Sequence, residues 1–413
     1  MADTTLNETP RGSRLHIAIF GRRNAGKSSL INALTNQNIA IVSNVPGTTT
    51  DPVFKSMEIL PIGPVVLIDT AGIDDVGELG SLRIEKALAV LVKADLLLLV
   101  IDPSSGAGVY EEDIIKKAKE NKVPVVAVLN KMDLYPDTAV QEFSKRLNLP
   151  VMPVSALTRQ GINELKLAMI KSAPKDWVAP TILGDLISPG DTVVLVVPID
   201  LAAPKGRLIL PQVQTIRDIL DHDAMAYVVK ERELKKALAN LKEKPRLVVT
   251  DSQAFLKVAA DTPKDVPMTS FSILFARYKG NLQTMVEGAR AIDRLIPGDK
   301  VLIAEACTHH RVEDDIGTIK IPRWLRQLVG GALDFQWVSG IELPPNLQDY
   351  KLIVHCGACM INRKEMLHRT MMAQQAGIPM VNYGVLIAHV LGILKRALAP
   401  FPEVSHLLEE SKD

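Results

Sequence analysis

The segment HIAIFGRRNAGKSSLINALT, residues 16–35, decides the fold of the first part of the chain. It begins with a short apolar run, passes through a glycine-containing turn and ends in a pattern typical of a helix. Within it, GRRNAGKS (21–28) fits the pattern G-x-x-x-x-G-K-[ST], a loop whose backbone N–H groups surround phosphate oxygens. Such a loop requires a strand before it and a helix after it, and the segment predicts both.

Further short apolar runs alternate with helical stretches up to about residue 173: VVLID, LLLLVID, VPVVAVLN and PVMPVS. Continuous apolar strands separated by helices are typical of a parallel sheet covered on both faces. We therefore predict an α/β chain, in which a P-loop domain with a mostly parallel, doubly wound sheet is followed by two smaller αβ domains with parallel sheets. The predicted domains are 1–176, 177–262 and 263–413, and the proline-containing stretch at 173–191 is the first linker.

The phosphate loop alone leaves ATP and GTP open, and NKMD (130–133) decides between them. It matches the N-K-x-D pattern of GTP-binding proteins, in which the aspartate accepts two hydrogen bonds from the guanine edge. We assign that role to Asp133, with Asn130 bracing the loop and Lys131 lying over the base. The motifs GTTT (47–50), DTAG (69–72) and SAL (155–157) occur in the order that a GTPase domain requires.

These motifs give a complete list of expected nucleotide-site residues. Lys27, Thr49, Asp69 and Gly72 are the catalytic candidates, with Thr48 as the alternative to Thr49. Ser28, Thr49 and Asp69 are the expected Mg²⁺ ligands. The residues expected to bind GTP or GDP are Gly21, Asn24, Ala25, Gly26, Lys27, Ser28, Ser29, Asn130, Lys131, Asp133, Ser155 and Ala156.

Two residues suggest how hydrolysis proceeds. Ile73 follows DTAG where Ras-like proteins carry a water-orienting glutamine, and an isoleucine cannot orient water by hydrogen bonding. Asn24, with the GTTTD stretch, resembles the tRNA-modification GTPase branch of the Era-like family. That resemblance implies a K⁺ ion held by Asn24. We therefore expect slow intrinsic GTP hydrolysis that K⁺ stimulates.

The chain contains 3 cysteines, and all of them lie in its last third. Cys307 ends the apolar run KVLIAEAC, and Cys356 and Cys359 form C-x-x-C after KLIVH. Because ligands collect at the carboxyl ends of parallel strands, this spacing places the thiols around one crevice. His309, His310 and His355 are adjacent nitrogen donors, His310 being the one more typical of a structural or solvated position.

Four interpretations of the thiols are open from spacing alone. They are a structural zinc site of Cys₃His type, an iron–sulfur cluster, a redox dithiol and buried inert thiols. A cluster usually takes four cysteines, so three would leave one iron with a weak or exchangeable ligand.

The thiol pattern also carries a resemblance that covers the whole chain. C-x-H at 307–309, a gap, and then H-C-x-x-C at 355–359 resembles HydF, the GTPase family among the maturation proteins of [FeFe]-hydrogenase. The stretch GDTVVLVVPIDLAAPKGRLILPQVQTIRDIL, which begins at residue 190, is also similar to this family. The resemblance implies that 177–262 is a dimerisation domain and 263–413 a cluster-binding domain.

The resemblance further implies a [4Fe–4S] cluster on Cys307, Cys356 and Cys359, with His309 and His355 as ligands or as neighbours of the cluster. It implies that a di-iron precursor is the cargo and that apo-hydrogenase receives it. Two radical-SAM maturases and a second copy of the chain are the other implied partners, with GTP acting as a switch on partner contacts. The alternative is an RNA-modification or ribosome-assembly GTPase with a structural zinc site.

Composition bears on that alternative and on location. The formal net charge is +1, with 48 basic and 47 acidic residues, which gives no support to a nucleic-acid partner. An odd number of cysteines suits a reducing compartment. The stretch MADTTLNETPRGSRL has no apolar signal region, and the apolar runs are too short to span a bilayer. We therefore expect a cytoplasmic protein without membrane contact.

Overall fold

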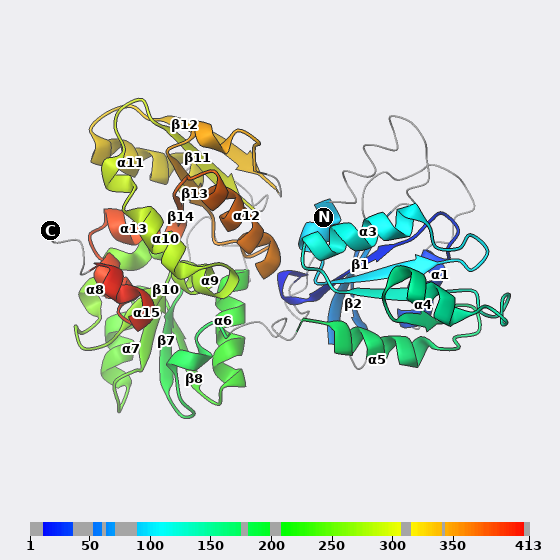
Figure 1. Cartoon of the computed structure of the whole chain (residues 1–413). Helices are drawn as coiled ribbons and strands as arrows, with labels where there is room; N and C mark the ends of the chain where they lie inside the picture. The colour runs from blue at the N-terminus through cyan, green and yellow to red at the C-terminus, as the bar shows by residue number, and fades with distance from the viewer. Residues whose placement is uncertain are drawn as a thin grey trace. The chain divides into compact units, whose positions relative to one another are not determined.

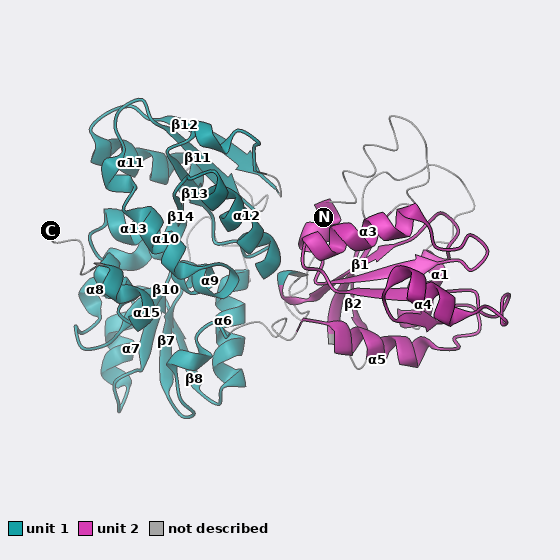
Figure 2. Ribbon diagram, in the orientation of Figure 1, with its two compact units in different colours: residues 1–12, 180–413 teal, residues 13–179 magenta. Residues whose placement is uncertain are grey.

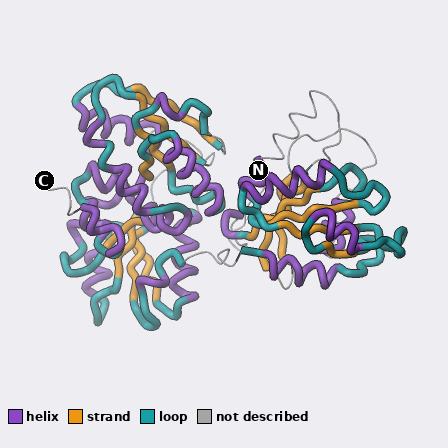
Figure 3. The backbone as a smooth tube through the Cα atoms, in the orientation of Figure 1, coloured by secondary structure: helices purple, strands orange, loops and turns teal. Residues whose placement is uncertain are grey.

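The computed structural model describes residues 11–35, 53–59, 63–70, 89–174, 181–198, 208–306, 315–340 and 343–408. The chain divides into two compact units (Figure 2). The N-terminal unit is Ser13–Ala179, and the C-terminal unit is Pro180–Asp413 together with Met1–Gly12. Helices and strands alternate through both units (Figure 3).

The N-terminal unit contains a six-stranded sheet in the order β2-β3-β1-β4-β5-β6 (Figure 1). Its strands are β1 (Leu15–Phe20), β2 (Val53–Ile59), β3 (Gly63–Asp69), β4 (Leu96–Ile101), β5 (Val125–Leu129) and β6 (Val151–Pro153). All neighbours pair in parallel except β2 and β3. The chain lays strands to both sides of β1, so β1 ends at the switch point where open α/β sheets bind ligands.

Helices cover both faces of this sheet. The helices are α1 (Lys27–Thr35), α3 (Val109–Glu120), α4 (Val140–Leu147) and α5 (Ile162–Ser172). Ile17 and Ile19 of β1 share a core with α1 and α5, whereas Ala18 and Phe20 share the opposite core with α3 and α4. Because successive side chains of a strand point to opposite faces, β1 must be apolar at nearly every position.

The C-terminal unit contains two four-stranded parallel sheets, in the orders β10-β9-β7-β8 and β12-β11-β13-β14 (Figure 1). The strands are β7 (Thr192–Val196), β8 (Met225–Val229), β9 (Leu247–Thr250), β10 (Met268–Ser270), β11 (Lys300–Glu305), β12 (Asp334–Ser339), β13 (Leu352–His355) and β14 (Met380–Asn382). The helices are α6 (Leu210–Asp221), α7 (Leu234–Asn240), α8 (Phe255–Asp261), α9 (Phe271–Lys279), α10 (Leu282–Ala289), α11 (Ile321–Val329), α12 (Arg363–Gln375), α13 (Tyr383–Val390), α14 (Leu394–Leu398) and α15 (Pro402–Ser405).

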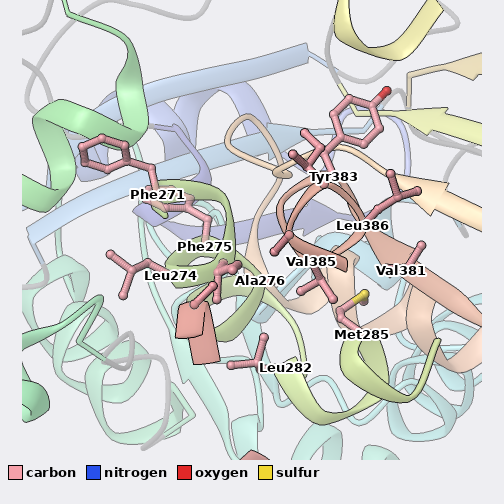
Figure 4. Close-up of a cluster of buried hydrophobic side chains, with 14 of the residues drawn as sticks. Phe271, Leu274, Phe275, Ala276, Leu282, Met285, Val381, Tyr383, Val385 and Leu386 are labelled. Carbon is pink, nitrogen blue, oxygen red and sulfur yellow. The ribbon is translucent and has the colours of Figure 1, made fainter. Parts of the chain in front are cut away.

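One continuous apolar core joins the two sheets of this unit. Helices α9, α10 and α13 lie within it, and Figure 4 shows side chains of these helices gathered in one cluster. Phe275 of α9, Met285 of α10 and Val385 of α13 are fully buried there. Burial of such side chains contributes about 1.5–3 kcal/mol each, so the sheets are held together by substantial apolar contact.

The predicted fold class is confirmed: the sheets are mostly parallel and covered by helices. The predicted boundaries at 176/177 and 262/263 stay predictions. The division of the chain into two units falls between residues 179 and 180, and β10, at 268–270, pairs with β9. Within the described part of the chain, every helix is too short or too polar to cross a bilayer.

Candidate functional site

The nucleotide motifs of the N-terminal unit gather at one edge of its sheet. Gly21 follows β1, Asp69 ends β3, Asn130 follows β5 and Ser155 follows β6. Because these strands are parallel neighbours in one sheet, their carboxyl ends all lie at the same edge.

Two glycines of the phosphate loop hold positions that other residues could not occupy. Gly26 has φ +90°, and a Cβ placed on it would lie 2.2 Å from Nδ2 of Asn130. A Cβ on Gly21, where φ is +156°, would lie 2.3 Å from the carbonyl oxygen of Val100. The backbone therefore passes close to neighbouring strands, as a phosphate-cradling loop requires.

Lys27, the first residue of α1, lies inside the phosphate loop. Its Nζ donates hydrogen bonds to the carbonyl oxygens of Gly21, at 2.7 Å, and Arg22, at 2.9 Å. Asp69 lies at the end of the neighbouring β3; its burial raises its pKa, and the charges of Lys27 and Lys55 partly counter that effect. A half-buried carboxylate beside this lysine is the arrangement that a Mg²⁺–phosphate site needs.

Asn130 ties the base-recognition motifs to the phosphate loop. Its Nδ2 donates to the carbonyl oxygen of Ala25 at 3.0 Å, and its Oδ1 accepts from the backbone N–H of Ala156 at 3.0 Å. Ser155, which is also buried, donates to Asp133 Oδ1 at 2.6 Å. The structure thus brings together three of the predicted motifs, and the Asp133 carboxylate is oriented by Ser155.

Two ion pairs at this edge were not predicted from the sequence. Lys131 Nζ donates to Asp102 Oδ2 at 2.6 Å. Partial burial raises the pKa of Asp102, but hydrogen bonds from Lys131 and Ser104 outweigh it and lower the pKa below its usual value. The only available signal was that Asp102 follows the apolar run of β4.

The second pair joins the phosphate loop to α3. Arg22 Nε and Nη2 donate to the two carboxylate oxygens of Glu111, at 2.8 and 3.1 Å. Glu111 is buried, and its Oε2 also accepts from the N–H of Gly108 at 2.7 Å. No local pattern could reveal this pair, because its members lie 89 residues apart.

The remaining nucleotide candidates are placed in part. Ser28 and Ser29 lie in the first turn of α1, and Asn24 is exposed with φ +60°. Thr48, Thr49, Gly72 and Ile73 lie outside the described residues. Their expected roles stay predictions.

The thiol motif of the C-terminal unit lies at the carboxyl ends of β11 and β13. Cys356 directly follows β13 and is buried, and its Sγ accepts a hydrogen bond from the N–H of Ala306 at 3.2 Å. Ala306 directly follows β11, so this bond joins the ends of the two strands. Cys359 is half-buried in the turn that leads into α12.

Buried cations surround this turn, which we call the thiol loop (356–361). Lys279, at the end of α9, is 2% exposed, and its Nζ donates to the carbonyl oxygen of Gly12 at 2.7 Å. Burial lowers the pKa of Lys279 to about 8, and the neighbouring Cys359 partly counters this. Arg369 of α12 is also 2% exposed, and its Nη1 lies 2.8 Å from Nε2 of His355.

A carboxylate and a phenol complete the described part of the centre. Tyr383 donates through its hydroxyl to Glu305 Oε1 at 3.2 Å, and both side chains are buried. Burial raises the pKa of Tyr383 well above its usual value, and the charges of Glu305 and Cys356 add to that effect. Sequence reasoning missed Glu305, Lys279 and Arg369, because none of them belongs to a spaced motif.

The donors described here fit a thiolate-bound metal centre. A backbone N–H donor and buried cations both favour sulfur in its anionic form, which is the form that binds metals. Cys307, His309 and His310 lie outside the described residues, so the full donor set is not displayed. Among the residues that are described, no three His, Cys, Asp or Glu side chains form a metal-binding group.

Comparison with curated proteins gives matches to the GTPase part. The tRNA modification GTPase MnmE of Nitrosomonas europaea is 34% identical over 160 residues, 38% of this chain and 35% of that protein. MnmE of Bacillus subtilis is 36% identical over 173 residues, 40% of this chain and 37% of that protein. GTPase Der of Mycoplasmopsis pulmonis is 33% identical over 187 residues, 41% of this chain and 43% of that protein. The chain thus spans less than half the length of these relatives.

Among solved structures, Era of Aquifex aeolicus bound to GDP and aluminium fluoride is 23% identical, with a TM-score of 0.35. The match covers 54% of this chain and 97% of that one.

Family models cover most of the chain. The model described as 50S ribosome-binding GTPase matches residues 16–131. The Hydrogen maturase F dimerization domain matches residues 182–280, and the Hydrogen maturase F tetramerization domain matches residues 283–400. The two hydrogen maturase F models together match more than half of the 413 residues. The chain therefore belongs to the hydrogen maturase F family, HydF, with a GTPase domain at its N-terminal side.

Proposed function

We propose that this chain is a GTP-hydrolysing scaffold that binds an iron–sulfur cluster and carries a di-iron precursor to apo-[FeFe]-hydrogenase. The GTPase domain and the HydF domains support the general assignment. The cluster, the di-iron cargo and its transfer go beyond that assignment and are our proposal.

In the N-terminal unit the reaction is GTP + H₂O to GDP + phosphate. Asp133 and Asn130 would select guanine, Lys27 would neutralise the phosphates, and Ser28, Asp69 and Thr49 would hold Mg²⁺. Asn24 would help to hold K⁺, and hydrolysis would be slow without it. Equal hydrolysis rates in K⁺ and Na⁺ at matched ionic strength would contradict that last point.

In the C-terminal unit, Cys307, Cys356 and Cys359 would hold a [4Fe–4S] cluster. When bound, the cluster would supply an iron with an open or weakly held position, and the di-iron cargo would be held at this site. The N–H of Ala306 stabilises the Cys356 thiolate, and the buried Lys279 and Arg369 offset negative charge around the thiol loop. His309 would be either a ligand of the cluster or its neighbour.

The partners would be a second copy of the chain, two radical-SAM maturases and apo-hydrogenase. The matches to dimerization and tetramerization domains support self-association. GTP would act as a switch on the contacts with the other partners, as it does in GTPases whose loops order around the γ-phosphate.

The observation that carries the proposal is the position of the thiol motif. Cys356 lies within the region that matches the tetramerization domain, with Ala306 N–H bonded to its sulfur across the ends of β11 and β13. The MnmE and Der relatives match the GTPase part alone, so the alternative of an RNA-modification GTPase gains nothing from the rest of the chain.

A transfer assay tests the proposal. The chain is loaded anaerobically with cluster and a synthetic di-iron complex and then mixed with apo-hydrogenase. We expect hydrogenase activity to appear with the natural chain and to be lost with Cys356→Ala. A Ser405→Ala variant is the control, because Ser405 lies in α15, away from the thiol loop in sequence. Full activation by Cys356→Ala, at a rate equal to the control, would contradict the proposal.

A further inference from the structure

The buried guanidinium of Arg369 has a defined set of contacts. Nη1 lies 2.8 Å from Nε2 of His355, and Nη2 donates to the carbonyl oxygen of Gly340. Within the described part of the chain, Nε has no hydrogen-bond partner. Arginine stays protonated in proteins, so this guanidinium is a full positive charge in a site that is 2% exposed.

These contacts determine which ring nitrogen of His355 carries a proton. Arginine only donates hydrogen bonds, so Nε2 of His355 must be the acceptor and carries no proton. On the other side of the ring, Nδ1 lies 2.8 Å from the carbonyl oxygen of Cys356, which can only accept. Nδ1 therefore carries the proton, and the imidazole is neutral. Turning the ring over would put carbon atoms opposite both partners, so this orientation alone satisfies them.

The same contacts leave His355 without a nitrogen for iron. A metal ligand needs a free lone pair, and the lone pair on Nε2 is directed at Arg369. The ring is also 0% exposed, which gives it no room to turn toward a ligand at the surface. His355 thus belongs to the support around the thiol loop.

Arg369 is connected to the Cys356 backbone through His355, whose Nδ1 donates to the carbonyl oxygen of Cys356. Glu365 lies one turn earlier in α12 and is 7% exposed, so its carboxylate offsets part of the guanidinium charge. A positive charge beside a cluster ligand favours the reduced form of the cluster, which carries one more electron. The strength of that effect depends on a low-dielectric setting, which this site provides.

We propose that His355 and Arg369 form a positioning pair for the cluster: His355 binds the guanidinium instead of iron, and the guanidinium holds a positive charge beside the Cys356 sulfur. This rests on the proposed function, since it requires a cluster on Cys356. The group on which the pair would act is an iron–sulfur cluster, whose sulfur atoms are anionic.

The test compares variants of the full chain after anaerobic reconstitution with iron and sulfide. His355→Gln keeps an acceptor for Arg369 and removes the imidazole, whereas His355→Ala removes both. Arg369→Met removes the positive charge. Arg369→Lys keeps the charge but has a single nitrogen in place of the two that contact His355 and Gly340. Arg396→Met is the matched control, because Arg396 donates to the backbone oxygens of Ala259 and Thr262 rather than to the thiol loop.

Three readouts are needed: iron and sulfide per chain, the midpoint potential of the cluster, and ¹⁴N couplings in pulsed EPR. We expect His355→Gln to keep the natural iron content, potential and ¹⁴N couplings. Arg369→Met and His355→Ala should both shift the potential to more negative values, with Arg369→Lys in between and Arg396→Met unchanged. If Arg369→Met does not fold, comparing His355→Gln with His355→Ala and Arg369→Lys still shows whether the midpoint potential depends on the pair.

Two results would overturn the pair. Loss of a ¹⁴N coupling in His355→Gln would make His355 an iron ligand. An unchanged midpoint potential in Arg369→Met, Arg369→Lys and His355→Ala would show that the guanidinium does not influence the cluster. If the natural chain takes up zinc and shows no cluster signal, the proposed function is wrong as well. That outcome differs from the two results above, in which the natural chain does hold a cluster.

Discussion

Asn130 is the residue through which the base-recognition motif and the phosphate loop become one site. Its amide bonds the backbone of Ala25 and of Ala156, and the side chain is 1% exposed. In Asn130→Ala both backbone groups lose a buried partner, at about 1–3 kcal/mol each. We expect GDP affinity to fall at least roughly 30-fold, the factor that a loss of about 2 kcal/mol corresponds to, measured by titration calorimetry.

Asn121→Ala is the matched control for this change. Asn121 bonds the carbonyl oxygen of Lys117 at the end of α3 and takes no part in the nucleotide motifs. Its substitution should leave GDP affinity as it is. Equal affinities for Asn130→Ala and the natural chain would show that the observed bonds do not shape the site.

Lys279 gives the C-terminal unit a definite pH dependence in the metal-free protein. Burial lowers its pKa from 10.5 to about 8. Below pH 8 the lysine is charged in both the native and the unfolded chain, so folding carries the full cost of burying the charge, about 3 kcal/mol. Between pH 8 and 10.5 the unfolded chain binds the proton and the native chain does not, so this contribution makes stability rise with pH.

Lys279→Met should therefore raise the free energy of unfolding at pH 7 and abolish the rise between pH 8 and 10.5. Denaturant unfolding of the metal-free chain at several pH values measures both. Lys244→Met, which removes an exposed lysine paired with Asp265, should keep the natural pH profile. A profile of Lys279→Met that parallels the natural one would show that another group is responsible.

Strand β8 presents apolar side chains to solvent at the edge of its sheet. It forms an edge of its sheet, and Met225, Tyr227 and Val228 are 54%, 40% and 43% exposed. An apolar edge strand readily pairs with another chain, and β8 lies within the matched dimerization domain. We expect Val228→Lys to weaken self-association at least tenfold, as measured by sedimentation equilibrium.

The control places the same change elsewhere. Val109, at the start of α3, is 77% exposed and lies outside the matched dimerization domain, so Val109→Lys should leave self-association unchanged. A natural dimerisation constant for Val228→Lys would mean that β8 is not part of the interface.

The elements were predictable where local chemistry determines them. The apolar runs gave β1, β4 and β5 because a strand buried on both faces must be apolar throughout. Helix α12 begins where local chemistry favours it, because the side chain of Asn362 caps it by accepting from the N–H of Glu365. The P-loop and N-K-x-D residues could also be predicted from the sequence, because the backbone geometry of these motifs requires those residue types.

The supporting residues were not predictable, because tertiary contacts bring them together. Arg22 and Glu111, Lys279 and Gly12, and Arg369 and Gly340 are distant in sequence and follow no spacing rule. The role of His355 shows the same limit. The motif indicates a histidine beside the thiols, but only the contacts of both ring nitrogens show what it binds.

In the whole molecule, the proposed switch requires that the state of the GTPase unit changes the contacts of the C-terminal unit with its partners. Lys27→Ala removes the ammonium from the phosphate loop and should lower GTP hydrolysis at least a hundredfold. We expect the variant to keep its iron and sulfide content, since the thiols belong to the other unit. Partner exchange, followed by labelled maturases in a pull-down, should no longer respond to GTP.

Lys116→Ala is the control for this prediction, because Lys116 is an exposed residue of α3. It should retain both hydrolysis and the response to GTP. Maturation at the full natural rate by Lys27→Ala would separate GTP hydrolysis from cluster transfer and remove the switch from the account.

Anaerobic reconstitution with iron and sulfide, followed by metal analysis and EPR of the reduced protein, tests whether the three cysteines hold a cluster. We expect about four iron atoms per chain and a [4Fe–4S]⁺ signal that Cys356→Ala abolishes. Stoichiometric zinc without a paramagnetic signal would contradict this expectation, because the cysteines would then only brace the fold.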